Sequence, residues 1–522
     1  MRELGILIKN NYYMLLGSIQ GKKHRKSTVY ASTLLILGIV ALVALYTYEA
    51  NSMFVGLGKQ NGLYNLVFFH GILTSVCIAV VIGVMRISAK SKTNDTDILL
   101  SLPIKKIYIV LAKTINKYVF DFFFESLLFT PYYILYLVYT GFNVQTLLIC
   151  IAINFTLPLF SVGLSYVLNF LVERICAKLK SGNFIKSIFT SIIFILVLAL
   201  LLLKTSFYGT VTETNMENYF SDRFFSNTIL QMILTHNIKY LVIYLCLTIG
   251  TFTLGVTLFS INYGKTFASF HSKSTTLKFN EPKSMFKNLY KKELNTYLST
   301  PAYITNTIIG PALMLVFSIL LASLGISGIE SMFGISIENK TILTAILTLL
   351  FCVMTASTVI SSCSISLESH NLWIIKSSPI DELQLLNAKA LLHISIMFPA
   401  ILISAIICTL SLSLPFTSFI IMTTLPLLLT TLIAYGGLLI NILLPNLDWD
   451  DETKVVKQSL SVLITMIFSL IISLLPLLMI LIFDNITLSI LYISAYSIYI
   501  ILLGLVQFVL FTKGIKQFRK LA

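Results

Sequence analysis

Apolar stretches of roughly 20 residues recur along the whole chain, separated by polar segments. Because a helix of about 20 apolar residues crosses the hydrocarbon core of a bilayer, each stretch predicts a membrane-spanning helix. The pattern predicts twelve spans. They are residues 29–48, 63–85, 119–139, 146–170, 188–203, 240–261, 302–324, 342–361, 391–410, 416–439, 460–482 and 488–511.

The composition agrees with this pattern. Hydrophobic residues make up 57% of the 522 residues and charged residues only 11%, whereas soluble domains carry about 25% charged residues. A water-soluble core cannot hide that much apolar surface. The predicted fold class is therefore an all-α polytopic membrane protein with about 12 transmembrane helices.

The charges predict the orientation of the chain in the membrane. The net charge is +15, and the cations cluster beside apolar stretches, at residues 22–26, 86–106, 174–186, 265–292 and 513–520. The positive-inside rule places these segments and both termini in the cytoplasm, in agreement with an even number of spans. We expect a multi-pass plasma-membrane protein in contact with lipid. This distribution argues against a nucleic-acid partner.

Two pairs of short matches predict an internal repeat. SLPI at residues 101–104 matches SSPI at 377–380, and the offset of 276 also aligns Lys113 with Lys389. TLPL at residues 156–159 recurs at 424–427. The matches occur in the same order and at the same place in the span count, which predicts two parallel six-helix repeats. The predicted divisions are a first half at 1–262, a cytoplasmic linker with an interfacial helix at 263–300, and a second half at 301–522.

Each half begins with a segment that has apolar and polar residues on opposite helical faces. Residues 2–19 place Leu4, Leu7 and Ile8 on one face, and residues 284–298 place Leu289 and Tyr297 opposite several polar residues. Both segments fit amphipathic helices that lie on the inner leaflet before the first span of each half. The alternative is a basic tail without regular structure.

The matched tetrapeptides predict a sharp corner between two helices. Proline disfavours helix at the preceding residue, so a helix running up to Lys376 ends at Ser378. Pro379 suits the first turn of the next helix, with Ser378 as its cap, and Asp381 suits the positive N-terminus. Pro103 predicts the same corner in the first half, although Lys105 opposes the helix dipole there.

Apolar and charged residues alternate around both corners on the predicted cytoplasmic side. Exposed apolar groups there require a partner, which is the bilayer surface, the same chain or another protein. A repeated surface suits a twofold partner below the membrane. The candidate residues for this contact are Asp95, Asp97, Ile98, Leu99, Leu102, Pro103, Glu368, Leu372, Trp373, Ile375 and Pro379.

Two segments resemble a known family. The segment with Glu368, Trp373, SSPI and Lys389 looks like the cytoplasmic loop of fused twelve-span permease subunits of ABC exporters of the ABC-2 kind, which are common in Gram-positive bacteria. The segment PNLDWDDETKVVKQSLSVL, at residues 445–463, is also similar to that family. The resemblance implies that residues 92–104 and 368–380 are coupling helices on two separate ATPase subunits. It also implies outward transport of a peptide, drug or lipid.

The chain itself lacks the residues of an ATPase. Gly264-Lys265-Thr266 is not a phosphate-binding loop, because Phe259 stands where its first glycine belongs and the segment ends an apolar stretch. We therefore expect no enzyme activity and no cofactor in this chain, with ATP and Mg²⁺ bound by the partner subunit. The six histidines are scattered, so no metal site is expected either.

Ionisable residues recur every four positions at the start of the third predicted span. Lys117, Asp121 and Glu125 share one helical face, where they either line a substrate path or pair near the headgroups. Their counterparts at the offset of 276 are His393, Met397 and Ile401, which favours pairing. Asn154 and Asn441 are further candidates for the path, although packed helices also use such hydrogen bonds.

Two other functional classes remain open. An ion-coupled secondary transporter needs carboxylates at mid-membrane depth and broken helices at corresponding places in both halves. A membrane scaffold or immunity protein, which needs no ATPase, would leave both corners free of a motor protein.

Overall fold

The computed structural model describes residues 5–7, 9, 39–41, 43–59, 64–89, 102–176, 189, 238–263, 284–333, 340–449, 452–477 and 488–521. All regular structure in these residues is helical, and eleven helices are long and apolar enough to cross a membrane. The predicted class of all-α, multi-pass membrane protein is therefore confirmed. The predicted span at 188–203 and most of the amphipathic segment at 2–19 lie outside the described residues.

Contacts along the chain separate two compact units. Unit 1 comprises residues 1–178 and 200–275, and unit 2 comprises residues 179–199 and 276–522. The described helices of unit 1 are the span Ile39–Gly56, η1 (Phe54–Lys59), α3 (Tyr64–Ala89), α5 (Lys106–Thr140), α6 (Val144–Cys176) and α10 (Ile238–Asn262). Phe68, Phe129 and Tyr132 lie in its apolar core.

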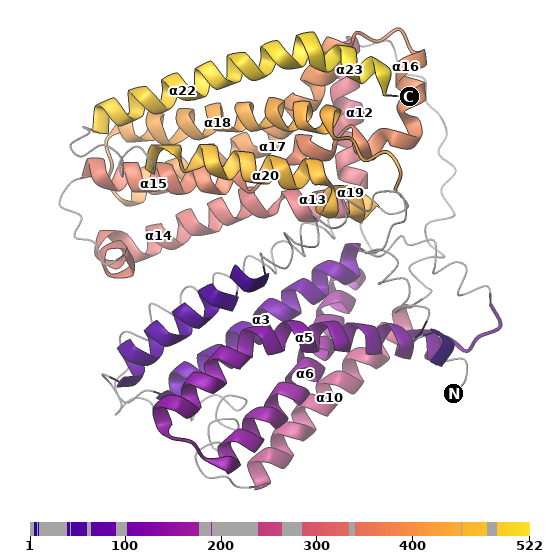
Figure 1. The fold of residues 1–522 in the computed structure, drawn as a ribbon, viewed down its shortest axis with the longest axis vertical. Coiled ribbons are helices and arrows are strands. Elements are labelled where there is room, and N and C mark those ends of the chain that lie inside the picture. The colour runs from indigo at the N-terminus through magenta and orange to yellow at the C-terminus, as the bar shows by residue number, and fades with distance from the viewer. Residues whose placement is uncertain are drawn as a thin grey trace. The chain divides into compact units, whose positions relative to one another are not determined.

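Unit 1 is held together by close packing of its long helices (Figure 1). The backbones of α6 and α10 approach closely, because a Cβ atom added to Gly163 would lie 2.5 Å from the carbonyl oxygen of Thr251. Small residues at such contacts let helix backbones approach closely, which gives membrane helices their van der Waals packing energy.

Unit 2 contains more helical elements than the described part of unit 1. In chain order they are α12 (Met285–Ser299), α13 (Pro301–Thr307), α14 (Ile309–Phe333), α15 (Lys340–Ala356), η3 (Ile360–Cys363), η4 (Ser366–Asn371), α16 (Leu372–Ser377), α17 (Glu382–Ser411), α18 (Phe416–Leu443), α19 (Glu452–Gln458), α20 (Leu460–Ser473), α22 (Leu488–Val509), η5 (Leu510–Gly514) and α23 (Ile515–Lys520). Within this unit, α18 lies against α15, α17, α20 and α22.

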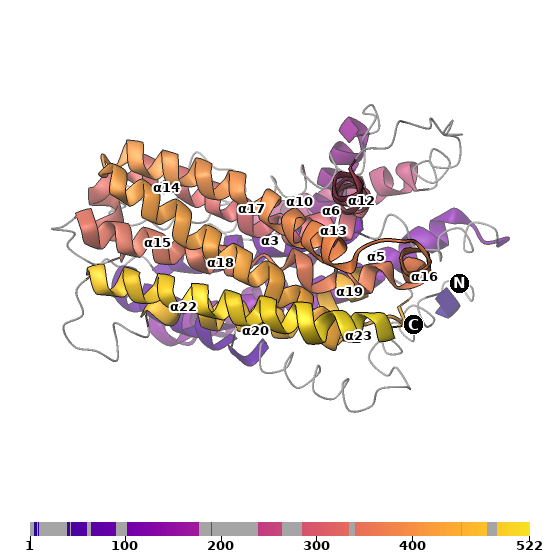
Figure 2. The same ribbon diagram turned by 90° about the horizontal axis from the view of Figure 1, so that it is seen from above.

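The amphipathic helix predicted at 284–298 is present as α12. It runs across the spans of unit 2, near the end where α16 and α23 lie (Figures 1 and 2). Its apolar side packs on the protein and is not left open to lipid, because Leu289 and Tyr297 are buried and the Tyr290 hydroxyl donates to Ser395 of α17. The predicted amphipathic helix is therefore present, and its position on the inner leaflet stays a prediction.

Two predicted spans of unit 2 are interrupted, and a third is preceded by a separate short helix. The span predicted at 302–324 begins instead at Ile309, because α13 and α14 are separate helices, and Pro311 in the first turn of α14 suits a helix start. The α-helix of the span predicted at 342–361 ends at Ala356 and is followed by two 3₁₀ turns. The segment predicted at 460–482 is preceded by α19, and Ser459 caps α20 by accepting from the backbone N–H of Val462.

Candidate functional site

The second corner forms a short helix with one anchored side and one open side. On α16, Leu372 and Ile375 are buried in an apolar cluster with Leu289 and Leu385. Trp373 is 68% exposed and Ile374 is 46% exposed. Because the buried pair holds the helix in place, the exposed pair forms a fixed apolar surface at the end of the bundle.

The corner itself follows the sequence prediction in part. Helix α16 ends at Ser377, as Pro379 predicts. The cap of α17 is Asp381, whose carboxylate accepts from the backbone N–H of Leu383 at 3.2 Å, and not Ser378. The hydroxyl of Ser378 instead donates to the carbonyl of Ile374 at 2.8 Å, which closes the end of α16.

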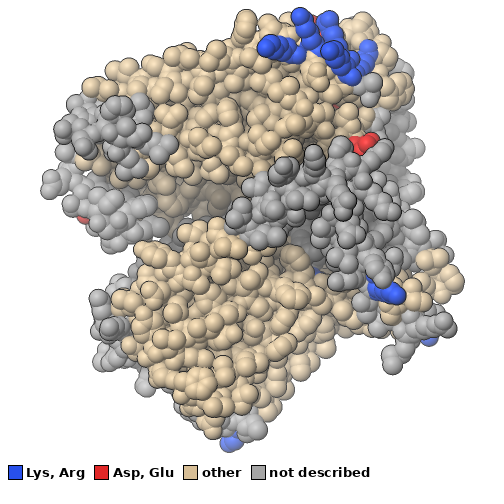
Figure 3. Space-filling model, in the orientation of Figure 1, with Lys and Arg blue, Asp and Glu red and all other residues tan. Residues whose placement is uncertain are grey.

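The C-terminal helix braces this corner. Lys376 donates to the backbone carbonyl of Arg519 at 3.2 Å, and Arg519 forms a two-pronged ion pair with Glu382, with N···O distances of 2.8 and 3.2 Å. Glu382 is the first residue of α17 and is partly exposed to water. Its hydrogen-bonded ion pair with Arg519 holds the pKa of its carboxyl below the ordinary value. Basic side chains gather on the surface over α23 (Figure 3).

The two segments that carry the family resemblance meet inside unit 2. The indole N–H of Trp449 donates to the carbonyl of Ser366 at 2.8 Å, and the backbone N–H of Asn446 donates to the Ser366 hydroxyl at 3.0 Å. Asn441 uses all its hydrogen-bonding groups here. Its Oδ1 accepts from the N–H groups of Ile365 and Ser366, and its Nδ2 donates to Ser366 and Ser461.

This network explains how the second span of unit 2 can leave the α-helix inside the bundle. Backbone groups outside a regular helix are tolerated at membrane depth only where protein satisfies them. Asn441 provides the acceptor for two backbone N–H groups of this segment, those of Ile365 and Ser366. It therefore stabilises the 3₁₀ segment next to α16.

A buried ionic cluster lies beside the same segment. The ammonium of Lys389 lies 2.9 Å from Glu293 Oε2, 3.0 Å from Glu368 Oε2 and 3.3 Å from the carbonyl oxygen of Ser364. Lys292 contacts both carboxylates from the half-exposed side. The cluster joins α12, η4 and α17, and its two positive and two negative charges balance.

Burial and the neighbouring charges act against each other in this cluster. At Glu368 burial favours a higher pKa, but Lys389 and Lys292 outweigh it and hold the pKa of the carboxyl below its ordinary value. Loss of water around Glu293 raises the pKa of its carboxyl, while the cations Lys389 and Lys292 act in the opposite direction. Each proton of the Lys389 ammonium has an acceptor. These hydrogen bonds offset the free-energy cost of removing the ammonium from water.

Sequence reasoning missed Glu293 and the role of Lys389. The available signal was the position of Glu293 on α12, where Leu289, Glu293 and Tyr297 stand four residues apart on the buried side. A carboxyl group within an apolar stripe either pairs with a buried cation or takes up a proton. Nothing in the local sequence identifies which cation that is.

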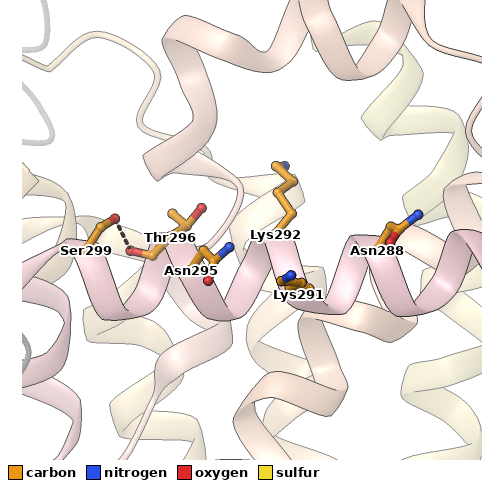
Figure 4. Close-up of a pocket in the computed structure, with 6 residues that line it drawn as sticks. All are labelled: Asn288, Lys291, Lys292, Asn295, Thr296 and Ser299. Atoms are coloured by element: carbon orange, nitrogen blue, oxygen red, sulfur yellow. Dashed lines mark hydrogen bonds between the residues drawn. The ribbon is translucent and has the colours of Figure 1, made fainter. Parts of the chain in front are cut away.

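The outward side of α12 lines an open polar groove of about 450 Å³ (Figure 4). Its lining side chains are Asn288, Lys291, Lys292, Asn295, Thr296 and Ser299. The Ser299 hydroxyl donates to the carbonyl of Thr296, and Lys292 is partly committed to the ionic cluster. The groove belongs to a single helix and offers hydrogen-bond donors to solvent.

The first corner lies mostly beyond the described residues. Asp95, Asp97, Ile98 and Leu99 fall outside them, while Leu102 and Pro103 are exposed just before α5 begins at Lys106. Ile104 packs beside an apolar cluster that includes Leu7 and Ile109.

The residues predicted to line a substrate path are divided between the two units. In unit 1, Lys117 pairs with Asp121 at 2.5 Å, Glu125 is buried, and Asn154 accepts from the Ser126 hydroxyl at 3.2 Å. In unit 2, Asn441 is occupied by the network around Ser366. The structure therefore brings Lys117, Asp121 and Glu125 together on α5 and gives Asn441 a local structural contact.

Comparisons of the chain with family models, curated proteins and solved structures find no match. Within the described ranges, no three His, Cys, Asp or Glu side chains are grouped closely enough to hold a metal ion.

Proposed function

We propose that this chain is the membrane-spanning subunit of an ABC exporter. The observation that carries the proposal is α16, whose anchored side fixes Trp373 and Ile374 as an exposed apolar pair at the basic end of unit 2. An apolar pair of this kind suits a protein partner. The resemblance described above identifies the partner class as a separate ATPase subunit, two copies of which would bind ATP and Mg²⁺.

Force transfer is supported by the connections of α16. The helix is joined to α17 through the Asp381-capped corner and to α23 through Lys376. The adjacent η4 segment is joined to α12 and α17 through Glu368. A displacement of α16 would therefore move several elements of unit 2 together. Closure of the ATPase pair need only favour one of two states by a few kcal/mol to shift the populations strongly.

The expected cycle is alternating access with export of a peptide, drug or lipid. In this proposal the ATPase subunits close on ATP, the corner helices move with them, and the membrane helices rearrange to release the substrate outward. The corner at Pro103 would be the contact of unit 1, with Leu102 as its exposed apolar side chain in the described residues.

The experiment compares two variants of the tagged full chain, purified from membranes of its native host. Trp373→Glu combined with Ile374→Glu should abolish retention of a P-loop ATPase and the associated ATP hydrolysis. Ser299→Glu adds charge at an exposed position at the far end of α12 and should preserve both. Retention of the ATPase by the double variant, or absence of any P-loop ATPase from the wild-type complex, would refute the proposal.

A second candidate is an ion-coupled secondary transporter. The buried carboxyl of Glu125, inside a predicted span, favours it. The helix geometry opposes it, because α15 ends at Ala356 while α3 continues unbroken to Ala89, beyond the position that corresponds at the offset of 276. Substrate transport by the chain purified without any ATPase, driven by an ion gradient, would select this candidate.

A further inference from the structure

Unit 1 holds a carboxyl group that the exporter proposal does not use. Glu125 is fully buried between the helices of unit 1, and neither of its carboxylate oxygens has a hydrogen-bond partner in the described structure. It lies six residues inside the predicted span that starts at Val119, which is about 9 Å along the helix axis. A carboxyl group there is separated from bulk water by the bundle and the bilayer.

The charges around Glu125 do not neutralise it. Lys117 lies two turns away, about 12 Å along the axis, and its ammonium contacts Asp121 at 2.5 Å. Asp121 stands between the two, one turn from Glu125, and is itself buried. If all three side chains were ionised, this face of α5 would carry one uncompensated negative charge inside the bundle.

The neighbouring helices supply polar groups but no second cation. The titratable neighbours are Tyr118 on α5 and Tyr244 of α10, and α6 contributes the hydroxyl of Ser161 beside the carboxyl. On α3, the buried His70 contacts the ring of Tyr132, almost two turns further along α5. Neither of these tyrosines nor Ser161 can carry a positive charge at the Glu125 carboxyl.

Helix α3 also fixes the position of the ion pair. A Cβ atom added to Gly83 would lie 2.5 Å from the Lys117 ammonium, so the absence of a side chain at Gly83 makes room for it. Lys117 therefore makes its close contact with Asp121, one turn from Glu125. The carboxyl of Glu125 remains the uncompensated member of the three.

An ionised carboxylate without a counter-charge is very costly in a medium of low polarity, and such a group takes up a proton instead. We propose that Glu125 is a proton-binding site of unit 1, which holds a proton exchangeable with water while Lys117 and Asp121 remain a charged pair. The proton comes from water, forms an O–H bond on the carboxylate and returns to water, so no other reactant is needed.

Exposure to solvent rises along α5 from Glu125 toward Lys117, so water is nearer to the carboxyl on that side. Asp121 lies between Glu125 and Lys117, and the Lys117 side chain is 10% exposed, so polarity increases toward the basic end of the helix. Binding and release change the net charge of the three groups by one. This inference does not depend on the exporter proposal, since it concerns the interior of unit 1 alone.

The test is infrared spectroscopy of the full chain in lipid bilayers, where a protonated carboxylic acid has its own carbonyl stretching band. At pH 7, the difference between wild type and Glu125→Gln should contain one such band, and the band should shift when H₂O is replaced by D₂O. Glu382→Gln is the matched control, because Glu382 is ion-paired with Arg519 outside the bundle core and should contribute no such band.

Each outcome decides the proposal. If the difference spectrum lacks the band, Glu125 is ionised and the proposal fails. If the band persists without a shift after prolonged exposure to D₂O, the carboxyl is protonated but does not exchange its proton with water, and the proposal also fails. Glu125→Asp provides a second comparison if Glu125→Gln does not fold: the band should be displaced and still exchange. None of these measurements requires an ATPase.

Discussion

The two units bury their charges in different ways. In unit 2, Lys389 receives Glu293 from α12 and Glu368 from η4, and the half-exposed Lys292 completes a balanced cluster. In unit 1, Lys117, Asp121 and Glu125 come from one helix and leave a negative charge in excess. In unit 2 the charges balance within the protein, because three elements contribute to the cluster. In unit 1 the excess negative charge is balanced by binding a proton.

The position matched by the predicted repeat shows the same contrast. Lys113 aligns with Lys389, but it is only half-buried and its ammonium lies 4.9 Å from the centre of the Tyr263 ring. Lys106 and Glu382 nevertheless open α5 and α17 at positions 276 residues apart. The repeat itself stays a prediction.

The largest expected effect comes from removing the central cation of unit 2. Lys389→Met keeps the length of the side chain but leaves Glu293 and Glu368 buried together without their cation, which should lower the free energy of unfolding by about 3–5 kcal/mol. Both tryptophans, Trp373 and Trp449, lie in unit 2, so tryptophan fluorescence during unfolding in detergent measures this unit directly.

The matched variant in unit 1 is Lys113→Met. Its cation–ring contact at a half-buried site is worth about 1 kcal/mol, so the loss should be several times smaller. Unfolding of unit 1 can be followed by labelling of Cys150 with a thiol-reactive dye in a variant without other cysteines, because Cys150 is buried. Equal losses for the two lysine variants would remove the contrast between the units.

The next effect concerns the two asparagines predicted for the substrate path. Asn441→Leu should cost about 2–4 kcal/mol, because the buried N–H groups of Ile365 and Ser366 both lose their acceptor. Asn154→Leu removes one hydrogen bond with Ser126 at a half-buried site and should cost about 1 kcal/mol. The thermal unfolding midpoints test this order, read by tryptophan fluorescence for Asn441→Leu and by the dye assay for Asn154→Leu. A smaller loss for Asn441→Leu would contradict the network.

A smaller effect separates the two kinds of carboxyl. Glu293→Gln should cost about 1.5–3 kcal/mol, because Lys389 loses a charged acceptor while keeping Glu368. Glu125→Gln should change stability by less than about 1 kcal/mol, because an amide has the shape and the neutral charge of the protonated acid. Chemical unfolding of both variants at pH 7 measures the pair, and a large loss for Glu125→Gln would indicate that its negative charge is structural.

The smallest effect is expected at the surface. Arg519→Gln breaks the exposed ion pair with Glu382, which water and salt already screen. The unfolding midpoint should therefore stay the same as in the wild type at physiological salt concentration. A clear decrease would show that the corner at Pro379 depends on α23 more strongly than its exposure suggests.

Local sequence signals were sufficient for the elements that depend on one helix at a time. Apolar stretches gave the spans, Pro379 gave the end of α16 at Ser377, and the spacing of four residues gave the Lys117–Asp121 pair. They also gave α12, whose apolar and polar faces alternate with the helical period. Each of these features is decided by neighbours within two turns of the chain.

The sequence alone therefore determined the class of the protein, the position of most membrane helices and the ionic face of α5. Only the tertiary structure decided that α12 packs on α17, that the second span of unit 2 breaks after Ala356, and that Lys389 meets Glu293 and Glu368. The physical reason is the separation along the chain between the residues that interact. Hydrophobic period and capping act between neighbours in the chain, whereas a buried charge or an unpaired backbone group is satisfied by residues that folding brings from 21 to 96 positions away.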